Sequence, residues 1–325
     1  MKNTGIVIFS HLRVMHLKKL LNSLVHNNTD LPITVYIDKY EKKPSVQNEL
    51  KNLIEEYNQK LNISEIILRP EKFGLKKNIL CGINRSFKLH DKLIILEEDL
   101  ILGKHAISYF QDCLEIYENS EEIYHVNGWS KPLANNPYEY DLFLTSFMQC
   151  SGWATWRNTW LEFEQFLNQD FVNLDKSEVN KIDLDGNLNN VNQLIKNNLN
   201  FINTWAVYWQ LYLFKNNKLS ISPFTSQTFH GGIDDLSTHS FVYEIKQSTL
   251  QNNKIDSRNI QKDTTVYEKL LSLSYDKKSK MNIKNITFLH IYQTLVTKLY
   301  KMFLMTFIGR FKLRVKDKNI LSAFV

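Results

Sequence analysis

Residues 92–102, KLIILEEDLIL, place three consecutive carboxylates between two short apolar runs. The Ile-rich run before Glu97 is typical of a buried strand. Carboxylates are costly in an apolar interior, so Glu97, Glu98 and Asp99 need water, a cation or positive partners. Mg²⁺ and similar cations bind one or two carboxylates together with phosphate oxygens. The stretch therefore indicates a site for a metal ion and a diphosphate, although such a triplet also occurs as a solvated loop after a strand.

The sequence before this stretch alternates between strand-like and helix-like segments. Apolar runs predict strands, and Leu at positions 17, 20, 21 and 24 recurs at helical spacing. This alternation predicts an α/β fold with a mainly parallel sheet flanked by helices. The expected strands are Gly5–Ser10, Ile33–Ile37, Ile63–Leu68 and 92–97. The expected helices follow the first three strands, one over the leucines at 17–24 and the others at 49–61 and 79–87.

Polar residues stand at the ends of several of these strands. The carboxyl ends of parallel strands meet at one edge of a sheet, where open α/β folds bind ligands. Ser10, Asp38 and the acidic triplet are therefore expected to converge. Arg13 is either a solvated first-turn residue or a partner for a phosphate or base. Asp38 either caps the next turn or hydrogen-bonds to a ribose or base edge.

Composition sets broad limits. The chain has 325 residues, 43% of them hydrophobic, and a formal charge of +6. This charge suits an anionic substrate or membrane surface and does not indicate a nucleic-acid-binding protein. Cys81, Cys113 and Cys150 match neither a zinc nor a disulfide pattern. The opening apolar run is too short for a secretion signal, so we expect a cytoplasmic chain.

The middle of the chain is rich in aromatic residues. Trp153, Trp156 and Trp160 stand within eight positions, and Trp205 lies in the apolar segment 201–214, which predicts a buried helix. Tryptophan clusters pack in cores, and aromatic faces also stack on sugar rings, so both roles stay open. The polar, Asn-rich segment 170–200 indicates a surface excursion or mobile loop and does not complete a calcium-binding pattern.

Seven stretches, taken in order, resemble one family. They are FSHLRVMHLKKLLNSL (9–24), VYID (35–38), RPEKFGLKKNILCGI (69–83), ILEEDL (95–100), CSGWATWRNTW (150–160), INTWAVYWQLYLFKNNKLSISP (202–223) and FHGGIDDLSTH (229–239). Together they resemble the GT-A-fold, nucleotide-sugar-dependent glycosyltransferases, in particular bacterial sugar transferases related to N-acetylglucosaminyltransferase I. The resemblance covers about residues 1–240, so we expect a GT-A (Rossmann-like) domain there and an extension over 241–325.

The resemblance implies an activity and roles for particular residues. It implies inverting transfer of a sugar from a nucleotide-diphosphate donor, a UDP-sugar by expectation, to a glycan or lipid-linked acceptor in bacterial surface polysaccharide or lipopolysaccharide synthesis. Mn²⁺ or Mg²⁺ would bind to Asp99. The residues expected at the donor are Arg13, Asp38, Gly74, Lys76, Glu97 and Glu98, and those expected at the acceptor are Trp153, Trp156 and Trp205.

The sequence departs from the family at the expected catalytic base. Related enzymes often carry an acid directly after the first Trp of the late segment, and here that residue is Ala206. Asp234 and Asp235 are the replacement candidates. The alternative is a non-catalytic sugar-nucleotide or glycan-binding protein of the same fold. A nucleotidyltransferase would show a Gly-rich phosphate loop after the first strand, and residues 11–16 are not one.

The C-terminal region departs from the family pattern. Residues 288–311 are apolar and aromatic but contain Lys298 and Lys301. Two lysines near the middle of a spanning helix would each cost about 2.5–3.5 kcal/mol. A basic amphipathic helix on an anionic membrane surface, at the inner face of the cytoplasmic membrane, is therefore expected, and a helix packed on the domain is the alternative. Its expected lipid-facing cations are Lys298, Lys301, Arg310, Lys312, Arg314 and Lys316.

Overall fold

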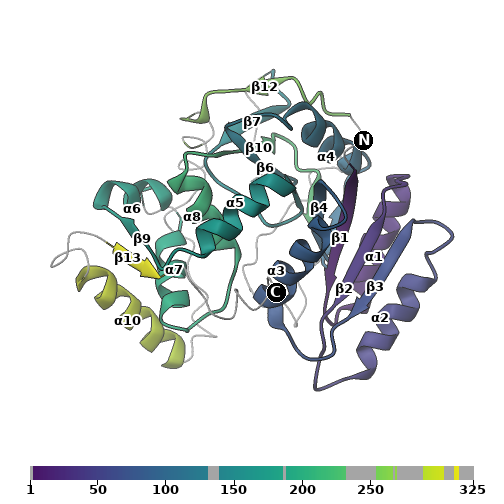
Figure 1. The fold of residues 1–325 in the computed structure, drawn as a ribbon, viewed down its shortest axis with the longest axis horizontal. Coiled ribbons are helices and arrows are strands. Elements are labelled where there is room, and N and C mark those ends of the chain that lie inside the picture. Colours follow the sequence, from purple (N-terminus) through teal and green to yellow (C-terminus); the bar gives the residue numbers. More distant parts are fainter. Residues whose placement is uncertain are drawn as a thin grey trace.

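The computed structural model describes residues 3–130, 139–185, 188–231, 254–265, 268, 288–303 and 311–314. Its centre is a nine-stranded mixed sheet in the order β12-β7-β10-β6-β8-β4-β1-β2-β3 (Figure 1). The strands are β1 Thr4–Ser10, β2 Ile33–Ile37, β3 Ile63–Leu68, β4 Lys92–Glu97, β6 Ile123–Asn127, β7 Leu142–Thr145, β8 Trp153–Trp156, β10 Leu219–Pro223 and β12 Ile260–Gln261.

Helices cover both faces of this sheet, and strand residues alternate between the two resulting cores. Ile6 and Ile8 pack with α1, α2 and α4, whereas Val7 and Phe9 pack with α3, α5 and α8. The prediction of an α/β fold with a mainly parallel sheet flanked by helices is confirmed. The helices are α1 Val14–His26, α2 Ser45–Glu55, α3 Gly74–Phe87, α4 Ala106–Ile116, α5 Arg157–Leu167, α6 Lys176–Ile182, α7 Asn190–Asn198, α8 Ala206–Lys215 and α10 Phe288–Phe303.

The strand order reverses next to β1. From β1 the chain adds β2 and then β3 on one side, but β4 pairs with β1 on the other side, and all of these pairs are parallel. In open α/β sheets, ligands bind outside the carboxyl ends of the strands at such a reversal. The register places Phe9 opposite Glu97, so the residues after β1 and β4 meet at this point.

Two short sheets extend the central one. β5 Leu100–Leu102 follows β4 after a tight turn and pairs with β11 Thr228–His230, which brings the late part of the chain to the acidic triplet. β9 Phe171–Leu174 pairs with β13 Phe311–Arg314. β13 and the nearby α10, which contacts α7, show that the described parts of the C-terminal extension pack on the rest of the chain (Figure 1).

The interpretation of 170–200 as a surface excursion or mobile loop is wrong. The segment contains β9, α6 and α7, which bury apolar side chains against α8 and β13. Although the segment is rich in Asn, it contains two short runs of apolar residues at helical spacing. The buried residues are Val172, Leu174, Val179, Ile182, Val191, Leu194 and Ile195.

Candidate functional site

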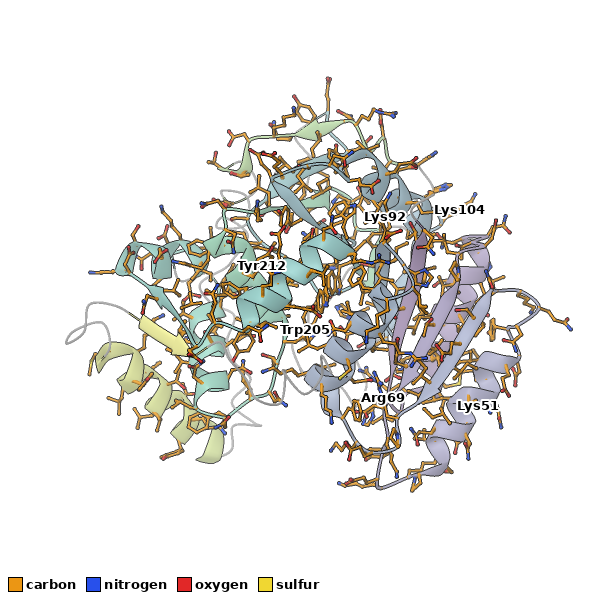
Figure 2. The ribbon with its side chains drawn as sticks, viewed as in Figure 1. Lys51, Arg69, Lys92, Lys104, Trp205 and Tyr212 are labelled. Atoms are coloured by element: carbon orange, nitrogen blue, oxygen red, sulfur yellow. The ribbon has the colours of Figure 1, made fainter. Side chains whose placement is uncertain are left out.

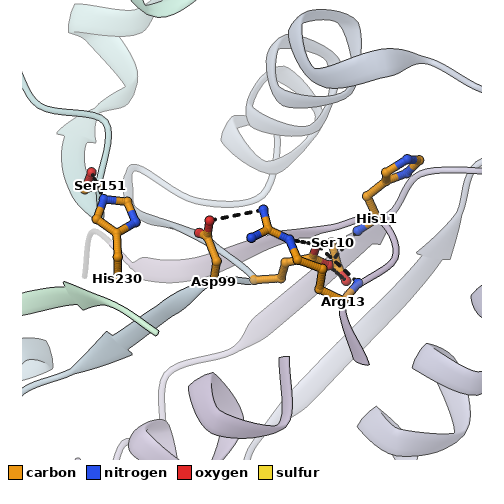
Figure 3. Close-up of polar contacts among 7 residues, drawn as sticks. Ser10, His11, Arg13, Asp99, Ser151 and His230 are labelled. Carbon is orange, nitrogen blue, oxygen red and sulfur yellow. Dashed lines mark hydrogen bonds and ion pairs between the residues drawn. The ribbon is translucent and has the colours of Figure 1, made fainter. Parts of the chain in front are cut away.

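Glu98 ties the loop after β1 to the end of β4. Its Oε2 accepts hydrogen bonds from Ser10 Oγ at 2.5 Å and the His11 backbone N–H at 2.7 Å. Its Oε1 lies 3.4 Å from both the Arg13 backbone N and Arg13 Nε (Figure 3). Because Glu98 is only 5% exposed and accepts from Ser10, His11 and Arg13, it organises the loop after β1. A contact between Glu98 and a ligand stays a prediction.

Arg13 also reaches the last carboxylate of the triplet. Its Nη2 lies 3.2 Å from Asp99 Oδ2, and the two side chains are 15% and 23% exposed. The guanidinium is therefore held by Glu98 on one side and faces Asp99 on the other (Figure 3). Arginine presents several donors in a planar fork that fits phosphate oxygens. The expected placement of Arg13 at the strand edge thus agrees with the structure.

The surroundings of Glu97 favour its protonated form. Burial raises its pKa to about 8, and the negative charges of Asp99 and Glu98 act in the same direction, against a smaller opposing effect of Arg13. A protonated carboxyl is a poor ligand for a divalent cation. Asp99 is therefore the carboxylate of the triplet best suited to bind a metal directly.

Asp38 organises the neighbouring strand end. Its Oδ1 accepts from the backbone N–H groups of Lys39 and Phe73 at 2.9 and 2.8 Å, and its Oδ2 accepts from Gly74 N–H at 2.8 Å. Gly74 has φ +71°, a left-handed conformation that favours glycine. Asp38 thereby holds the start of α3 against the end of β2.

Two cations lie near this second strand end. The Arg69 guanidinium stacks on the rings of Tyr36 and Phe73 at 4.8 and 4.7 Å and donates to Asn78 (Figure 2). Arg69 was not among the predicted site residues, and only its position after β3 hints at it. Lys76, which was predicted, is buried with Nζ 4.6 Å from the ring centroid of Tyr208.

His230 is not among the predicted site residues, although it lies in the segment 229–239 that resembles the family. The β11–β5 pairing places it opposite Leu100, and the backbone N–H of Gly231 donates to the Asp99 carbonyl at 2.5 Å. Its exposed imidazole lies beside the Asp99 carboxylate, on the side away from Arg13 (Figure 3). Nε2 is 2.9 Å from Ser151 Oγ, and Nδ1 has no hydrogen-bond partner among the described residues, so it could act as a ligand.

The three tryptophans expected at the acceptor lie in the core. Trp153 and Trp205 are 1% and 3% exposed and stack on each other at 5.3 Å, with Trp205 in the interior of the molecule (Figure 2). Trp156 projects from the opposite face of β8 and donates from Nε1 to the Leu114 carbonyl. The core role that the sequence left open is therefore the one their burial supports, since no broad ring face is available to a sugar.

A neutral histidine anchors this aromatic core. Burial lowers the pKa of His125 to about 3, and its ring stacks on Trp153 at 5.0 Å. Trp209 Nε1 donates to His125 Nδ1, and Nε2 faces the Asn127 side chain and the Gln149 carbonyl. The network fixes the segment just before Ser151, because Asn127 also accepts from the Gln149 backbone N–H at 2.5 Å.

The described residues do not by themselves form a complete metal site. Within the described ranges, no group of three or more His, Cys, Asp or Glu side chains is placed to hold a metal ion. Asp99 and His230 would supply at most one carboxylate and one imidazole, a combination that suits Mn²⁺ or Mg²⁺ only if a ligand and water fill the other positions. The candidate bases Asp234 and Asp235 lie outside the described residues, and Ala206 begins α8.

Comparisons with known proteins give similarities of structure alone. Neither a scan against models of protein families nor a search of curated proteins finds a match. The structure is similar to S. aureus TarS 1–349 (TM-score 0.35, 12% identity, 50% of this chain and 49% of that chain). It is also similar to the mannosyltransferase PcManGT from Pyrobaculum calidifontis in complex with GDP-Man and Mn²⁺ (TM-score 0.35, 8% identity, 52% of this chain and 47% of that chain). For GalNAc-T7 with UDP, GalNAc and Mn²⁺, the TM-score is 0.46 at 12% identity, and the match covers 71% of this chain and 44% of that chain.

Each of these matches spans less than half of the other chain. All three TM-scores lie below 0.5, so the function of this chain has to be derived from its own residues.

Replacing Trp153 distinguishes its two possible roles. Because Trp153 is buried among aromatic rings, Trp153→Ala should lower the free energy of unfolding by about 3–5 kcal/mol. The milder Trp153→Phe should cost less and remain folded. Urea unfolding measures both, with Leu161→Ala, at an exposed position of α5, as a control that should stay within about 0.5 kcal/mol. Unchanged stability of Trp153→Ala would contradict the core role.

The raised pKa of Glu97 predicts a pH-dependent stability. Between pH 4.5 and about 8, folded Glu97 keeps a proton that the unfolded chain releases, so stability falls as pH rises through this range. Glu97→Gln removes this loss. Its free energy of unfolding relative to wild type should therefore rise by at least about 1 kcal/mol from about pH 5 to about pH 8.5.

Urea unfolding at both pH values measures this change, with Glu56→Gln, at an exposed position, as the control. A difference between Glu97→Gln and wild type that is the same at both pH values would show that Glu97 is ionised in the folded chain.

Proposed function

We propose that this protein is a glycosyltransferase that moves a sugar from a nucleoside-diphosphate donor to an acceptor hydroxyl. The observation that carries the proposal is the placement of Arg13, Asp99 and His230 together at the reversal of strand order. An arginine, a partly exposed carboxylate and an imidazole at this point form a site for a diphosphate and a cation. A nucleoside diphosphate is a leaving group whose negative charge grows as its bond to the sugar breaks.

Arg13 would act on that growing charge. Its guanidinium is already fixed by Glu98, so little reorganisation is needed when a phosphate oxygen replaces Asp99 as its partner. A Mn²⁺ or Mg²⁺ ion bound to Asp99 and His230 would supply further charge stabilisation. Glu97, kept protonated, can donate a hydrogen bond and adds no negative charge beside the diphosphate.

The nucleoside would lie toward Asp38, Gly74 and Arg69. Asp38 already accepts three backbone N–H groups, and its Oδ2, with a single partner among them, keeps capacity for a ribose hydroxyl or a base N–H. A UDP-sugar remains the expected donor, with a glycan or lipid-linked acceptor of bacterial surface polysaccharide or lipopolysaccharide synthesis. Inversion by direct displacement also remains part of the proposal, with Asp234 or Asp235 as the base that deprotonates the acceptor.

A non-catalytic sugar-nucleotide or glycan-binding protein is the second candidate. Ala206 favours it, because the residue that begins α8 has no carboxylate to serve as a base. Both candidates predict donor binding at the same residues. They differ in turnover, because only the transferase would release free sugar or a glycosylated product from the donor.

Calorimetric titration of UDP, with and without Mn²⁺, tests the site. With Mn²⁺, Asp99→Asn and His230→Ala should each weaken UDP binding by at least about tenfold, because a contact to a charged group contributes roughly 1.5–3 kcal/mol. Without Mn²⁺, Asp99→Asn should bind UDP as well as wild type or more tightly, because it removes a negative charge beside the diphosphate. His26→Ala, in the last turn of α1, is the matched control.

Asp99→Asn is thus expected to weaken UDP binding with Mn²⁺ but not without it. This difference distinguishes a metal ligand from a residue that only maintains the fold. If Asp99→Asn weakened UDP binding equally in the presence and absence of Mn²⁺, Asp99 would not hold the cation. GDP and CMP titrated under the same conditions identify the nucleotide. Donor binding without hydrolysis or transfer over a broad panel of acceptors would favour the non-catalytic alternative.

A further inference from the structure

Helix α10 is amphipathic in the opposite sense to an ordinary surface helix. A helix on the outside of a globular domain normally turns its apolar stripe inward and its polar face to water. In α10 Thr297 is buried and Gln293, Thr294, Val296 and Lys301 are partly buried, so the described inward side is mostly polar. Four exposed apolar residues, Tyr292, Leu295, Leu299 and Met302, lie on the other side.

The inward side of α10 is polar, and one of its residues pairs with the domain. Thr297 is 2% exposed, and its hydroxyl donates to the Gln293 carbonyl within the helix. Lys301 Nζ lies 3.3 Å from Asp183 Oδ2, at the end of α6. Lys301 therefore lies against the domain, which corrects the expectation that it faces lipid. These contacts, together with the packing of α10 on α7, fix which side of the helix remains open.

The open side carries a continuous apolar stripe. Tyr292, Leu295, Leu299 and Met302 are 52%, 55%, 51% and 61% exposed, and their spacing of three, four and three residues places them on one side of the helix. Contiguous exposed apolar side chains on a soluble domain mark interaction surfaces, whereas isolated ones are common. Within the part of the chain that the structure describes, these four side chains stay exposed, so the stripe is a candidate interaction surface.

The positive charge around the stripe favours an anionic partner. Residues 288–303 contain no Asp or Glu, and Lys298 is exposed on the flank of the stripe. The sequence that follows is basic, with Arg310, Lys312, Arg314, Lys316 and Lys318 against one acid, Asp317. Apolar side chains flanked by cations and tyrosine suit the boundary between the head groups and acyl chains of an anionic bilayer.

We propose that the stripe Tyr292, Leu295, Leu299 and Met302 docks α10 flat on an anionic membrane surface, with the rest of the domain held above it through α7. Among the described residues, no helix is both long and apolar enough to cross a bilayer, so the contact is peripheral. The proposal does not depend on sugar transfer, because it rests on the exposure and charge of α10 alone. It adds a surface at which a membrane-bound acceptor would be concentrated.

The alternative partner for the stripe is a second copy of this chain. A symmetric pairing through the stripe would bring the two Lys298 side chains near each other, and residues 288–303 offer no acid to compensate them. A bilayer containing anionic lipid provides that compensation. The charge of the flank therefore favours the membrane over self-association.

Vesicle co-sedimentation of the full chain tests the proposal. Wild type should bind vesicles of phosphatidylcholine with phosphatidylglycerol, bind weakly to phosphatidylcholine alone, and lose affinity as salt rises. Leu295→Glu with Leu299→Glu should reduce binding to the anionic vesicles by at least about tenfold. Leu89→Glu with Leu161→Glu, a pair of exposed leucines elsewhere, adds the same charge and should bind like wild type.

Circular dichroism and light scattering complete the test. Because Leu295 and Leu299 are exposed, the double variant should melt at the temperature of wild type. Equal vesicle binding by the α10 pair and the control pair would overturn the proposal, as would failure of wild type to bind anionic vesicles. A wild-type dimer that the α10 pair converts to a monomer would assign the stripe to self-association instead.

Discussion

The structure of the site depends on the buried carboxylate of Glu98. It accepts hydrogen bonds from Ser10 and from two backbone N–H groups of the following loop, and it pairs with Arg13. An uncompensated buried charge costs about 3–5 kcal/mol, so these contacts hold the loop after β1 firmly against β4. The Arg13 guanidinium therefore lies beside Asp99 before any ligand binds.

A second constraint is the joining of distant segments at the same edge. β5 leaves the acidic triplet and pairs with β11, so His230 reaches Asp99 although more than a hundred residues separate them. On the other side, Asp38 joins the end of β2 to the start of α3. The buried His125 network fixes the segment that carries Ser151, the partner of His230. The side chains of the candidate site are thus supported by groups that are themselves buried and hydrogen-bonded.

The sequence predicts the local features of this fold well. Apolar runs identify β1, β2, β3 and β4, and the polar residues after them converge as expected because parallel strands end at one edge. It does not predict the internal role of Glu98 or the position of His230, since both depend on contacts between distant segments. Residues 170–200 were misjudged because asparagines outnumber the apolar residues that α6 and α7 bury. Tryptophan suits a core and a sugar-binding surface equally well. The role of these three residues could therefore be assigned only from their burial.

The most direct test of the account is a crystal structure of the chain with UDP and Mn²⁺. The account predicts a diphosphate in contact with the Arg13 guanidinium and a Mn²⁺ ion bound to Asp99, His230 and phosphate oxygens, with Glu98 still bonded to Ser10 and His11. Nucleotide bound at another face of the sheet, or bound here with Asp99 and His230 both free of metal, would contradict it.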